Sequence, residues 1–281
     1  MTEPPGAASP LRLYGGAVAR VLARGRRRSD ADLDAVAERP VLVLGSPRSG
    51  TSFVARSIGR VSGFADLGEV APWKGAIPQL VSLPEAEAAE RLRKTLETVR
   101  RLGFVRHLRA VEQSPETAFV LGAAMCAYPQ ATVVHMIRDP RDVASSLLEK
   151  GWLKAESGGH DDVAAPYGGH ARFWVEEGRA QDFDGVSDAR RAAWAWRRYV
   201  TAARSAPQNM LEVRYEELAG DPQAAGREIA EHIGADPILL ARALADVHAE
   251  SVGRWRRDLN EEQVADVEAE AGPLLRELGY S

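Results

Sequence analysis

Short apolar runs alternate along this chain with longer segments in which apolar residues recur at helical spacing. VLVLG at 41–45 and ATVVHMIRD at 131–139 are continuous apolar runs, which is typical of strands buried on both faces of a parallel sheet. Each run leads into a helical segment, at 51–61 and 140–150, and the second of these begins with Pro140, a residue favoured in the first turn of a helix. Repeated strand–helix units predict an α/β fold with a central parallel sheet flanked by helices.

The same patterns predict further elements on both sides of these units. Short runs at 109–112 and 210–218 predict two more strands, and helical periodicity predicts the helices 84–103, 116–128, 189–206, 221–233, 237–247 and 260–278.

The N-terminal part differs from the rest in composition. Residues 1–10 are rich in proline, glycine and alanine, and we expect them to be disordered. Residues 11–28 predict a helix with a basic face. Such a helix can lie on a membrane surface, but its apolar face is thin, which favours packing on the main body or solvation. We therefore divide the chain into an N-terminal extension, 1–38, and one main domain, 39–281.

Residues 151–187 are rich in glycine, histidine, aspartate and aromatic residues. The segment is too long for an ordinary connection, so we interpret it as a lid or an acceptor-site insertion. Its acidic and histidine residues match no recognised ligand spacing, and we expect no metal site; these residues are His160, Asp161, Asp162 and His170.

Composition narrows the classes of function. The chain has 281 residues and a formal net charge of −4, which argues against a general nucleic-acid binder.

Cys126 is the single cysteine, so no internal disulfide can form, and a reducing, cytoplasmic setting fits. Cys126 lies in an apolar helical run and is expected in the core. No apolar run reaches the ~18 residues of a membrane span, and no secretion signal is recognised. The oligomeric state is left open.

The loop LGSPRSGTSFV at 44–54 nearly matches the phosphate-binding pattern G-x-x-x-x-G-K-[ST]. Gly45 and Gly50 have the required spacing, but Thr51 stands where the pattern has lysine. A loop between a buried strand and a helix presents backbone N–H groups and a helix N-terminus to an anion. The missing lysine, and the lack of an acidic strand end to hold magnesium, disfavour a triphosphate. Arg48, within the loop, could instead contact an oxygen bridging a phosphate and a transferred group. The alternative is that Arg48 faces solvent or pairs with a carboxylate.

A second cluster follows the strand predicted at 131–139. Arg138 stands at the strand end and Ser146 about two helical turns later. Ligands bind at the carboxyl ends of parallel strands, so this pair could hold a second phosphate. The alternative is an ordinary ion pair between Arg138 and Asp142.

Taken together, the two clusters resemble the sulfotransferases that use 3′-phosphoadenosine 5′-phosphosulfate (PAPS). PRSGTS at 47–52 resembles that family's 5′-phosphosulfate loop, and RDPRDVASS at 138–146 resembles its 3′-phosphate motif. RYEEL at 214–218, SVGRWRRDL at 251–259 and the ending RELGY are further similar segments, so the resemblance runs from about residue 40 to the end. The chain resembles best the broad bacterial branch, which also looks similar to the tyrosylprotein and heparan enzymes. The resemblance implies a P-loop three-layer α/β fold and transfer of a sulfuryl group without a metal.

The resemblance also implies roles for individual residues. Arg48 corresponds to the basic residue that stabilises the leaving phosphate oxygen. The residues implied in donor binding are Ser49, Gly50, Thr51 and Ser52 at the 5′-phosphate, Phe53 and Tyr215 near adenine, and Arg138, Ser146, Gly253 and Arg254 at the 3′-phosphate. Trp255 is expected to pack in the core.

A base must take the acceptor's proton as the sulfur is attacked in line. Many animal members of this family use a histidine, but the comparable stretch here is VEQSPE, with Gln113 near that position, and glutamine cannot act as a base. In the tyrosylprotein-like branch a glutamate soon after the loop helix serves. Glu69 in GFADLGEVAPW stands there and is the first candidate, and Glu112 is the second.

The acceptor is less well defined, because specificity belongs to the pocket and not to the fold. Aromatic residues could wall an acceptor site and favour a partly apolar small molecule, a lipid or a glycan; these are Trp73, Trp152, Tyr167, Phe173 and Trp174. Two alternatives stay open. One is a P-loop kinase or nucleotide hydrolase that uses magnesium-ATP, and the other is a non-catalytic PAPS-binding protein.

Overall fold

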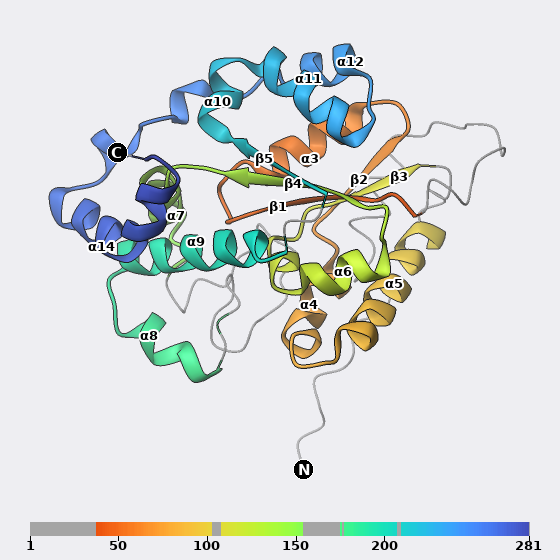
Figure 1. The fold of residues 1–281 in the computed structure, drawn as a ribbon. Coiled ribbons are helices and arrows are strands. Elements are labelled where there is room, and N and C mark those ends of the chain that lie inside the picture. The colour runs from red at the N-terminus through yellow and green to blue at the C-terminus, as the bar shows by residue number, and fades with distance from the viewer. Residues whose placement is uncertain (1–37, 103–107, 154–174, 176, 207–208, 281) are drawn as a thin grey trace.

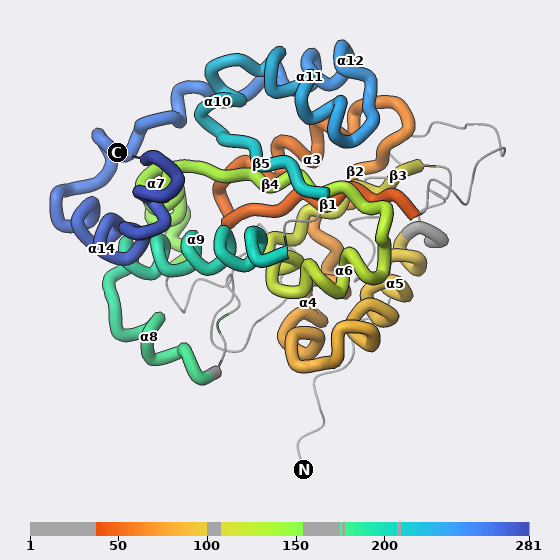
Figure 2. The backbone as a smooth tube through the Cα atoms, viewed as in Figure 1, coloured from red at the N-terminus to blue at the C-terminus, as the bar shows by residue number. Residues whose placement is uncertain are grey.

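A five-stranded parallel sheet forms the centre of the protein (Figures 1 and 2). The computed structural model describes residues 38–102, 108–153, 175, 177–206 and 209–280. The strand order is β2-β3-β1-β4-β5. The strands are β1 Val41–Gly45, β2 Phe64–Gly68, β3 Arg109–Glu112, β4 Thr132–Ile137 and β5 Met210–Arg214. Because every pairing is parallel, the carboxyl ends of all five strands lie at one edge of the sheet.

Two layers of helices cover the sheet (Figure 1). One face carries α3 Thr51–Arg60, α11 Pro222–Ile233 and α12 Pro237–Leu244, and the other carries α4 Ala71–Leu80, α5 Glu85–Leu102, α6 Leu121–Ala127, α9 Asp188–Arg204 and α14 Glu261–Glu277. Side chains alternate along β1 to meet these layers. Val41 and Val43 join the core beneath α3, α11 and α12, whereas Leu42 and Leu44 join the core beneath α4, α5 and α6. This double burial explains the continuous apolar run in the sequence.

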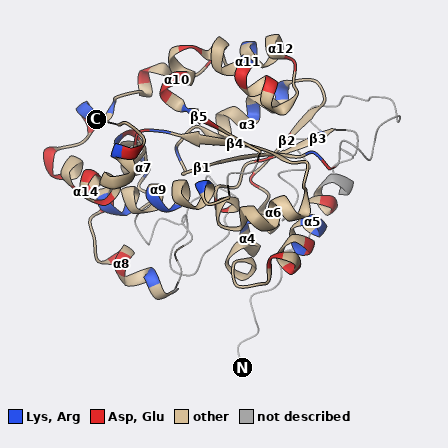
Figure 3. Ribbon diagram, in the orientation of Figure 1, with Lys and Arg blue, Asp and Glu red and all other residues tan. Residues whose placement is uncertain are grey.

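Shorter elements complete the chain. Helix α7, Pro140–Lys150, follows β4 and packs with α9 and α14. The others are the short helices α8 Ala180–Asp184, α10 Tyr215–Gly220 and α13 Trp255–Asp258, and the 3₁₀ turns η2 Pro115–Val120, η3 Glu177–Arg179 and η4 Ala249–Ser251. Charged residues lie mainly on the outer helices, and the central strands carry few (Figure 3).

The predicted α/β class and its central parallel sheet are confirmed. The four predicted strands are present, but β2 and α4 were not predicted. In FADLG a buried Asp66 interrupts the apolar run, and its Oδ1 accepts the backbone N–H of Gly68 at 2.8 Å. In α4, glycine and two prolines obscure the helical pattern. The predicted helix 116–128 is in fact η2 followed by α6.

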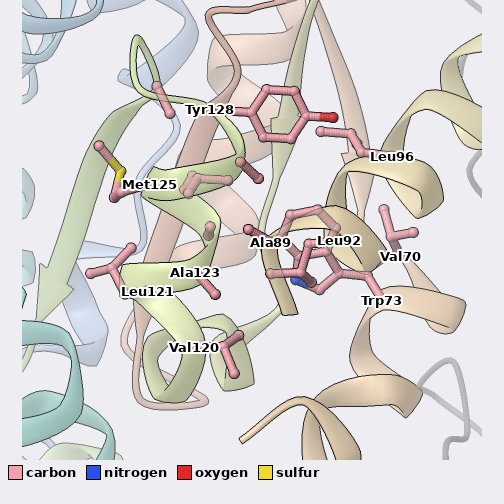
Figure 4. Close-up of a cluster of buried hydrophobic side chains, with 14 of the residues drawn as sticks. Val70, Trp73, Ala89, Leu92, Leu96, Val120, Leu121, Ala123, Met125 and Tyr128 are labelled. Carbon is pink, nitrogen blue, oxygen red and sulfur yellow. The ribbon is translucent and has the colours of Figure 1, made fainter. Parts of the chain in front are cut away.

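Three side-chain predictions were wrong. Trp73, expected at an acceptor site, is completely buried, and Figure 4 shows it packed beside Leu92; its Nε1 donates to Thr117 Oγ1 at 2.8 Å. Cys126, expected in the core, is exposed, because it lies on the outward side of a helix whose small residues face inward. Trp255, also expected in the core, is only partly buried.

Several predictions fall outside the described residues. These concern the N-terminal extension with its basic helix, and most of the 151–187 segment with Tyr167, Phe173 and Trp174. Within the described part of the chain, no helix has the length and apolarity needed to cross a bilayer.

The contact between α11 and α12 makes a testable prediction. A Cβ on Gly226 would lie 2.6 Å from the Ala241 Cα, so Gly226→Ala must push the two helices apart. We expect the variant to lose about 1–3 kcal/mol of unfolding free energy, measured by urea denaturation. Gly220→Ala is the matched control, because a Cβ there meets no atom within 4 Å. Equal stability of the two variants would contradict this packing.

Candidate active site

The two loops singled out in the sequence lie side by side because β1 and β4 are neighbouring parallel strands. Their register pairs Gly45 with Met136 at the carboxyl ends. A Cβ on Gly45 would lie 2.5 Å from the Met136 carbonyl oxygen, so the close approach of the strands requires glycine here. The loop after β1 therefore meets the start of α7.

Arg48 joins the two loops directly. Its Nε donates to Ser146 Oγ at 2.9 Å, and its backbone carbonyl accepts a hydrogen bond from Arg138 Nη1 at 3.1 Å. Its guanidinium also lies over the ring of Trp152, 5.2 Å from the centroid. Arg48 holds a φ of 73°, a left-handed conformation that is uncommon for a residue with a side chain. The two predicted anion sites are therefore parts of one continuous site.

This site is a pocket of about 770 Å³. Its charged lining is mostly positive, with six arginines against two glutamates: Arg48, Arg56, Arg60, Arg138, Arg254, Arg257, Glu149 and Glu250. The start of α3 forms one wall through Gly50, Thr51, Ser52 and Phe53. An arginine-lined pocket at a helix N-terminus favours a ligand with several negative charges.

Tyr215 closes the pocket from the side of β5. Its ring packs so tightly against Gly50 that a Cβ on Gly50 would lie 2.7 Å from the ring. Arg138 stacks on the same ring, with its guanidinium carbon 4.5 Å from the centroid. The Tyr215 hydroxyl donates to the His248 carbonyl at 3.1 Å, which ties the strand end to the C-terminal segment.

The C-terminal segment is held over the pocket by Asp142. The Asp142 carboxylate accepts the backbone N–H groups of Gly253 at 2.7 Å and Trp255 at 3.1 Å, and Arg138 Nη2 donates to the Ser251 carbonyl at 2.6 Å. Arg138 Nη2 lies 4.0 Å from Asp142, so the alternative ion pair is at most a minor contact. Burial raises the pKa of Asp142 above its ordinary value.

Within the two predicted anion motifs, two buried polar atoms have no hydrogen-bond partner among the described residues. They are Ser49 Oγ and Arg138 Nε. A buried donor without a partner is costly, and at a binding site a ligand can satisfy it. Both atoms belong to the predicted anion motifs.

Glu69 follows the end of β2, on the same edge of the sheet but outside the pocket lining. A short hydrogen-bonded path connects it to the loop. Ser52 Oγ donates to Gln113 Oε1 at 2.9 Å, and the Gln113 backbone N–H donates to the Gly68 carbonyl at 3.3 Å. The Glu69 carboxylate is mostly buried, with 14% of its side chain exposed, and accepts from Lys74 Nζ at 2.6 Å.

Glu112 is more deeply placed than Glu69. Its side chain is fully buried and accepts hydrogen bonds from the Ser114 backbone N–H at 2.8 Å, the Ser114 hydroxyl and Thr117 Oγ1 at 3.2 Å. Burial raises the pKa of Glu112 to about 7, although these donors oppose the shift. Such a pKa suits a base, but these contacts hold the carboxylate in the protein interior.

The structure brings most, but not all, of the predicted site residues together at the pocket. Most of the predicted donor-binding residues line the pocket together with Arg48, and Ser49 and Gly253 adjoin it. The two candidate bases, Glu69 and Glu112, lie outside the lining. No site role was predicted for Gln113 or Arg56, and Asp142 was considered only as an ion-pair partner of Arg138. Gln113 stands directly after a strand and Asp142 lies between Arg138 and Ser146, and these positions are the signal that the sequence offers for them.

Comparison with known families gives a match over residues 85–237, more than half of the chain, to the family described as the Sulfotransferase family. Mouse carbohydrate sulfotransferase 7 is 30% identical over 188 residues, covering 53% of this chain and 39% of that protein. The omega-hydroxy-beta-dihydromenaquinone-9 sulfotransferase Stf3 of Mycobacterium tuberculosis is 26% identical over 191 residues, covering 65% and 44%. The chain thus spans about two fifths of the length of these curated relatives.

Solved structures show the same fold. A sulfotransferase domain from the curacin biosynthetic pathway matches with a TM-score of 0.55 at 12% identity, covering 86% of this chain and 98% of that one. Mouse sulfotransferase SULT7A1 complexed with PAP matches with a TM-score of 0.50 at 16% identity, covering 89% and 90%.

Glu112 gives a pH-dependent prediction. Its folded-state pKa lies above the ordinary value near 4.5, so the folded protein binds this proton more tightly than the unfolded chain. The resulting stabilisation is complete at low pH and is lost as the pH rises through 7. A shift of this size corresponds to up to about 3 kcal/mol.

In Glu112→Gln the side chain cannot ionise, so we expect the decline in unfolding free energy between pH 5 and pH 8 to be smaller than in the wild type. Urea denaturation at the two pH values measures it. An equal decline in both proteins would show that Glu112 does not titrate in this range.

Proposed function

This chain belongs to the sulfotransferase family, and from that membership we propose that it moves a sulfuryl group from PAPS to a hydroxyl or amine of a small-molecule, lipid or glycan acceptor. The convergence of the two anion motifs, joined by the contact of Arg48 with Ser146, carries this proposal. A donor with one phosphate bonded to sulfate and a separate 3′-phosphate needs two linked anion sites.

The residues of the pocket fit such a donor. A volume of about 770 Å³ lies within the range of nucleotide-sized ligand sites. Six arginines offset the donor's negative charge. Ser49 Oγ and Arg138 Nε, which lack partners in the described part of the chain, can donate to its phosphate oxygens. Phe53 and Tyr215 line the pocket and offer aromatic surface for the adenine. No metal ligand is required for these contacts.

Glu69 and Arg48 have separate roles in the proposed in-line transfer. Glu69 takes the acceptor's proton as the acceptor oxygen or nitrogen forms a bond to sulfur. The bond between sulfur and the 5′-phosphate oxygen breaks, and adenosine 3′,5′-bisphosphate leaves. Arg48 stabilises the charge that develops on the leaving oxygen. Glu112 stays the second candidate base, although its burial and three internal donors favour Glu69.

The relatives support a lipid or carbohydrate acceptor. One is named as a carbohydrate sulfotransferase and the other as a sulfotransferase of a modified dihydromenaquinone. In this chain Trp152, beside Arg48, offers an apolar surface near the expected position of the transferred group. The lid role of 151–187, a cytoplasmic location and the division into 1–38 and 39–281 stay predictions.

Two other functions are less well supported. A kinase or nucleotide hydrolase using magnesium-ATP needs the lysine that Thr51 replaces. A non-catalytic PAPS-binding protein would not need a carboxylate held beside a lysine at the same sheet edge, as Glu69 is.

We expect Arg48→Ala to lower turnover by ~10²–10³, as loss of one transition-state charge contact does, with little change in the unfolding midpoint. Transfer of radiolabelled sulfur from PAPS to a panel of hydroxyl and amine compounds measures turnover. Arg91→Ala is the control, because Arg91 is an exposed residue paired with Glu87 on α5. Normal turnover by Arg48→Ala would remove this residue from the mechanism.

Calorimetry with adenosine 3′,5′-bisphosphate tests the donor site directly. We expect the wild type to bind the bisphosphate without metal and in preference to magnesium-ATP. Arg138→Ala should weaken that binding by about 10–100-fold, because it removes a charge-assisted hydrogen bond. Preference for magnesium-ATP would overturn the proposed function, and unchanged affinity in Arg138→Ala would show that the second anion site lies elsewhere.

A further inference from the structure

Behind the proposed base, one buried ammonium lies between two carboxylates. Lys74 Nζ is 2.6 Å from Glu69 Oε2 and 3.7 Å from Glu116 Oε2. Lys74 comes from α4, Glu69 from the turn before α4, and Glu116 from η2. Lys74 and Glu116 are both buried. Neither residue belongs to the donor-binding motifs or lines the arginine pocket.

Glu116 is fixed in the interior by one of its two oxygens. Glu116 Oε1 accepts a hydrogen bond from the Tyr199 hydroxyl at 2.8 Å, donated from α9. Glu116 Oε2 is buried and has no hydrogen-bond partner among the described residues. A buried carboxylate oxygen without a partner is costly, and the Lys74 ammonium is the nearby positive charge that offsets it.

We propose that Lys74 is a positioning residue for the proposed base Glu69, and that Glu116, held by Tyr199, anchors Lys74 from the opposite side. This inference rests on the proposed function, because it assumes that Glu69 receives the acceptor's proton.

The sharing of one ammonium has a chemical consequence. Lys74 contacts Glu69 on one side and lies near Glu116 on the other, so the ammonium that orients Glu69 is itself held in place. When Glu69 takes the proton, Lys74 still has a carboxylate with which to pair, and no buried positive charge is left alone.

The charged and titratable groups near Glu116 and its turn η2 belong to α4, the turn before α4, β3 and α9. Lys74 on α4 and Glu69 before α4 act on Glu116 by their charge, and Tyr199 on α9 donates to it. Two further charged groups contact the turn η2 and not Glu116 itself: Glu112 on β3 accepts from Thr117 Oγ1, and Arg198 on α9 lies over the ring of Phe119. Burial raises the pKa of Glu116, Lys74 opposes the rise and Glu69 adds to it. The two neighbours therefore act on this group in opposite directions.

Carboxyl carbon NMR of glutamate-labelled protein tests the arrangement. The Glu116 signal is identified by its loss in Glu116→Gln. We expect Lys74→Met to raise the pKa of Glu116 further and Glu69→Gln to lower it. Lys94→Met, which removes an exposed lysine on α5, is the control and should leave it unchanged. If neither variant moves the pKa of Glu116 relative to this control, the three groups do not form one unit and the inference is overturned.

A kinetic measurement separates positioning from a purely structural role. We expect Lys74→Met to lower turnover by about 10–100-fold while its affinity for adenosine 3′,5′-bisphosphate stays within about twofold of the wild type. If Lys74→Met does not fold, Lys74→Gln serves in both experiments. Normal turnover in a folded Lys74 variant would overturn the positioning role.

The experiments distinguish failure of the proposed function from failure of the positioning role of Lys74. If the wild type does not bind the bisphosphate, the proposed function fails, whatever the Glu116 titration shows. If it binds and Glu69→Gln keeps full turnover, Glu69 is not the base and the inference fails with it. If Glu69→Gln is inactive but the Lys74 variants are normal, the proposed function stands and only the inference is lost.

Discussion

The close parallel pairing of β1 and β4 is the constraint on which the site depends. Gly45 allows the two strand ends to meet, since any side chain there would collide with the Met136 carbonyl. Parallel strands end at the same edge, so two loops about ninety residues apart in sequence become neighbours. The hydrogen bond between Arg48 and Ser146 is a direct result. Without this approach the two motifs would be separate and too far apart to hold one ligand.

The site combines a positive pocket with buried negative groups that hold it in shape. The arginines of the pocket would repel one another, but several are restrained by carbonyl or carboxylate oxygens. Arg138 donates to the carbonyls of Arg48 and Ser251, and Arg254 pairs with Glu149 and Asp258. Asp142 holds the C-terminal segment through two backbone N–H groups and so brings Arg254 to the pocket. The positive charge is thus held in place by the protein before any anion binds, which reduces the entropy lost on binding.

The acidic residues behind β2 and β3 have a different environment. Glu69 is partly exposed beside Lys74, whereas Glu112 and Glu116 are fully buried. Environments that separate neighbouring carboxyl groups in this way are how proteins assign acid and base roles to chemically identical side chains. The hydrogen bonds from Ser52 to Gln113 and from Gln113 to the Gly68 carbonyl connect these groups to the loop after β1. The glutamine at this position cannot act as a base, but it links the loop to the strand that precedes Glu69.

The sequence by itself determined the class of fold and identified the two motifs that we propose bind anions, because both depend on local patterns. Apolar runs such as VLVLG record burial on two faces, and the spacing of Gly45, Arg48 and Gly50 is set within a single loop. The tertiary structure decided what depends on contacts between distant segments. It placed Trp73 in the core, left Cys126 exposed, and formed β2 from a stretch whose buried Asp66 hides the strand pattern. It also brought Lys74, Glu69 and Glu116 together. Burial and the distance between charges arise only when the chain packs, so no local pattern could have shown which of these glutamates is paired and which is enclosed.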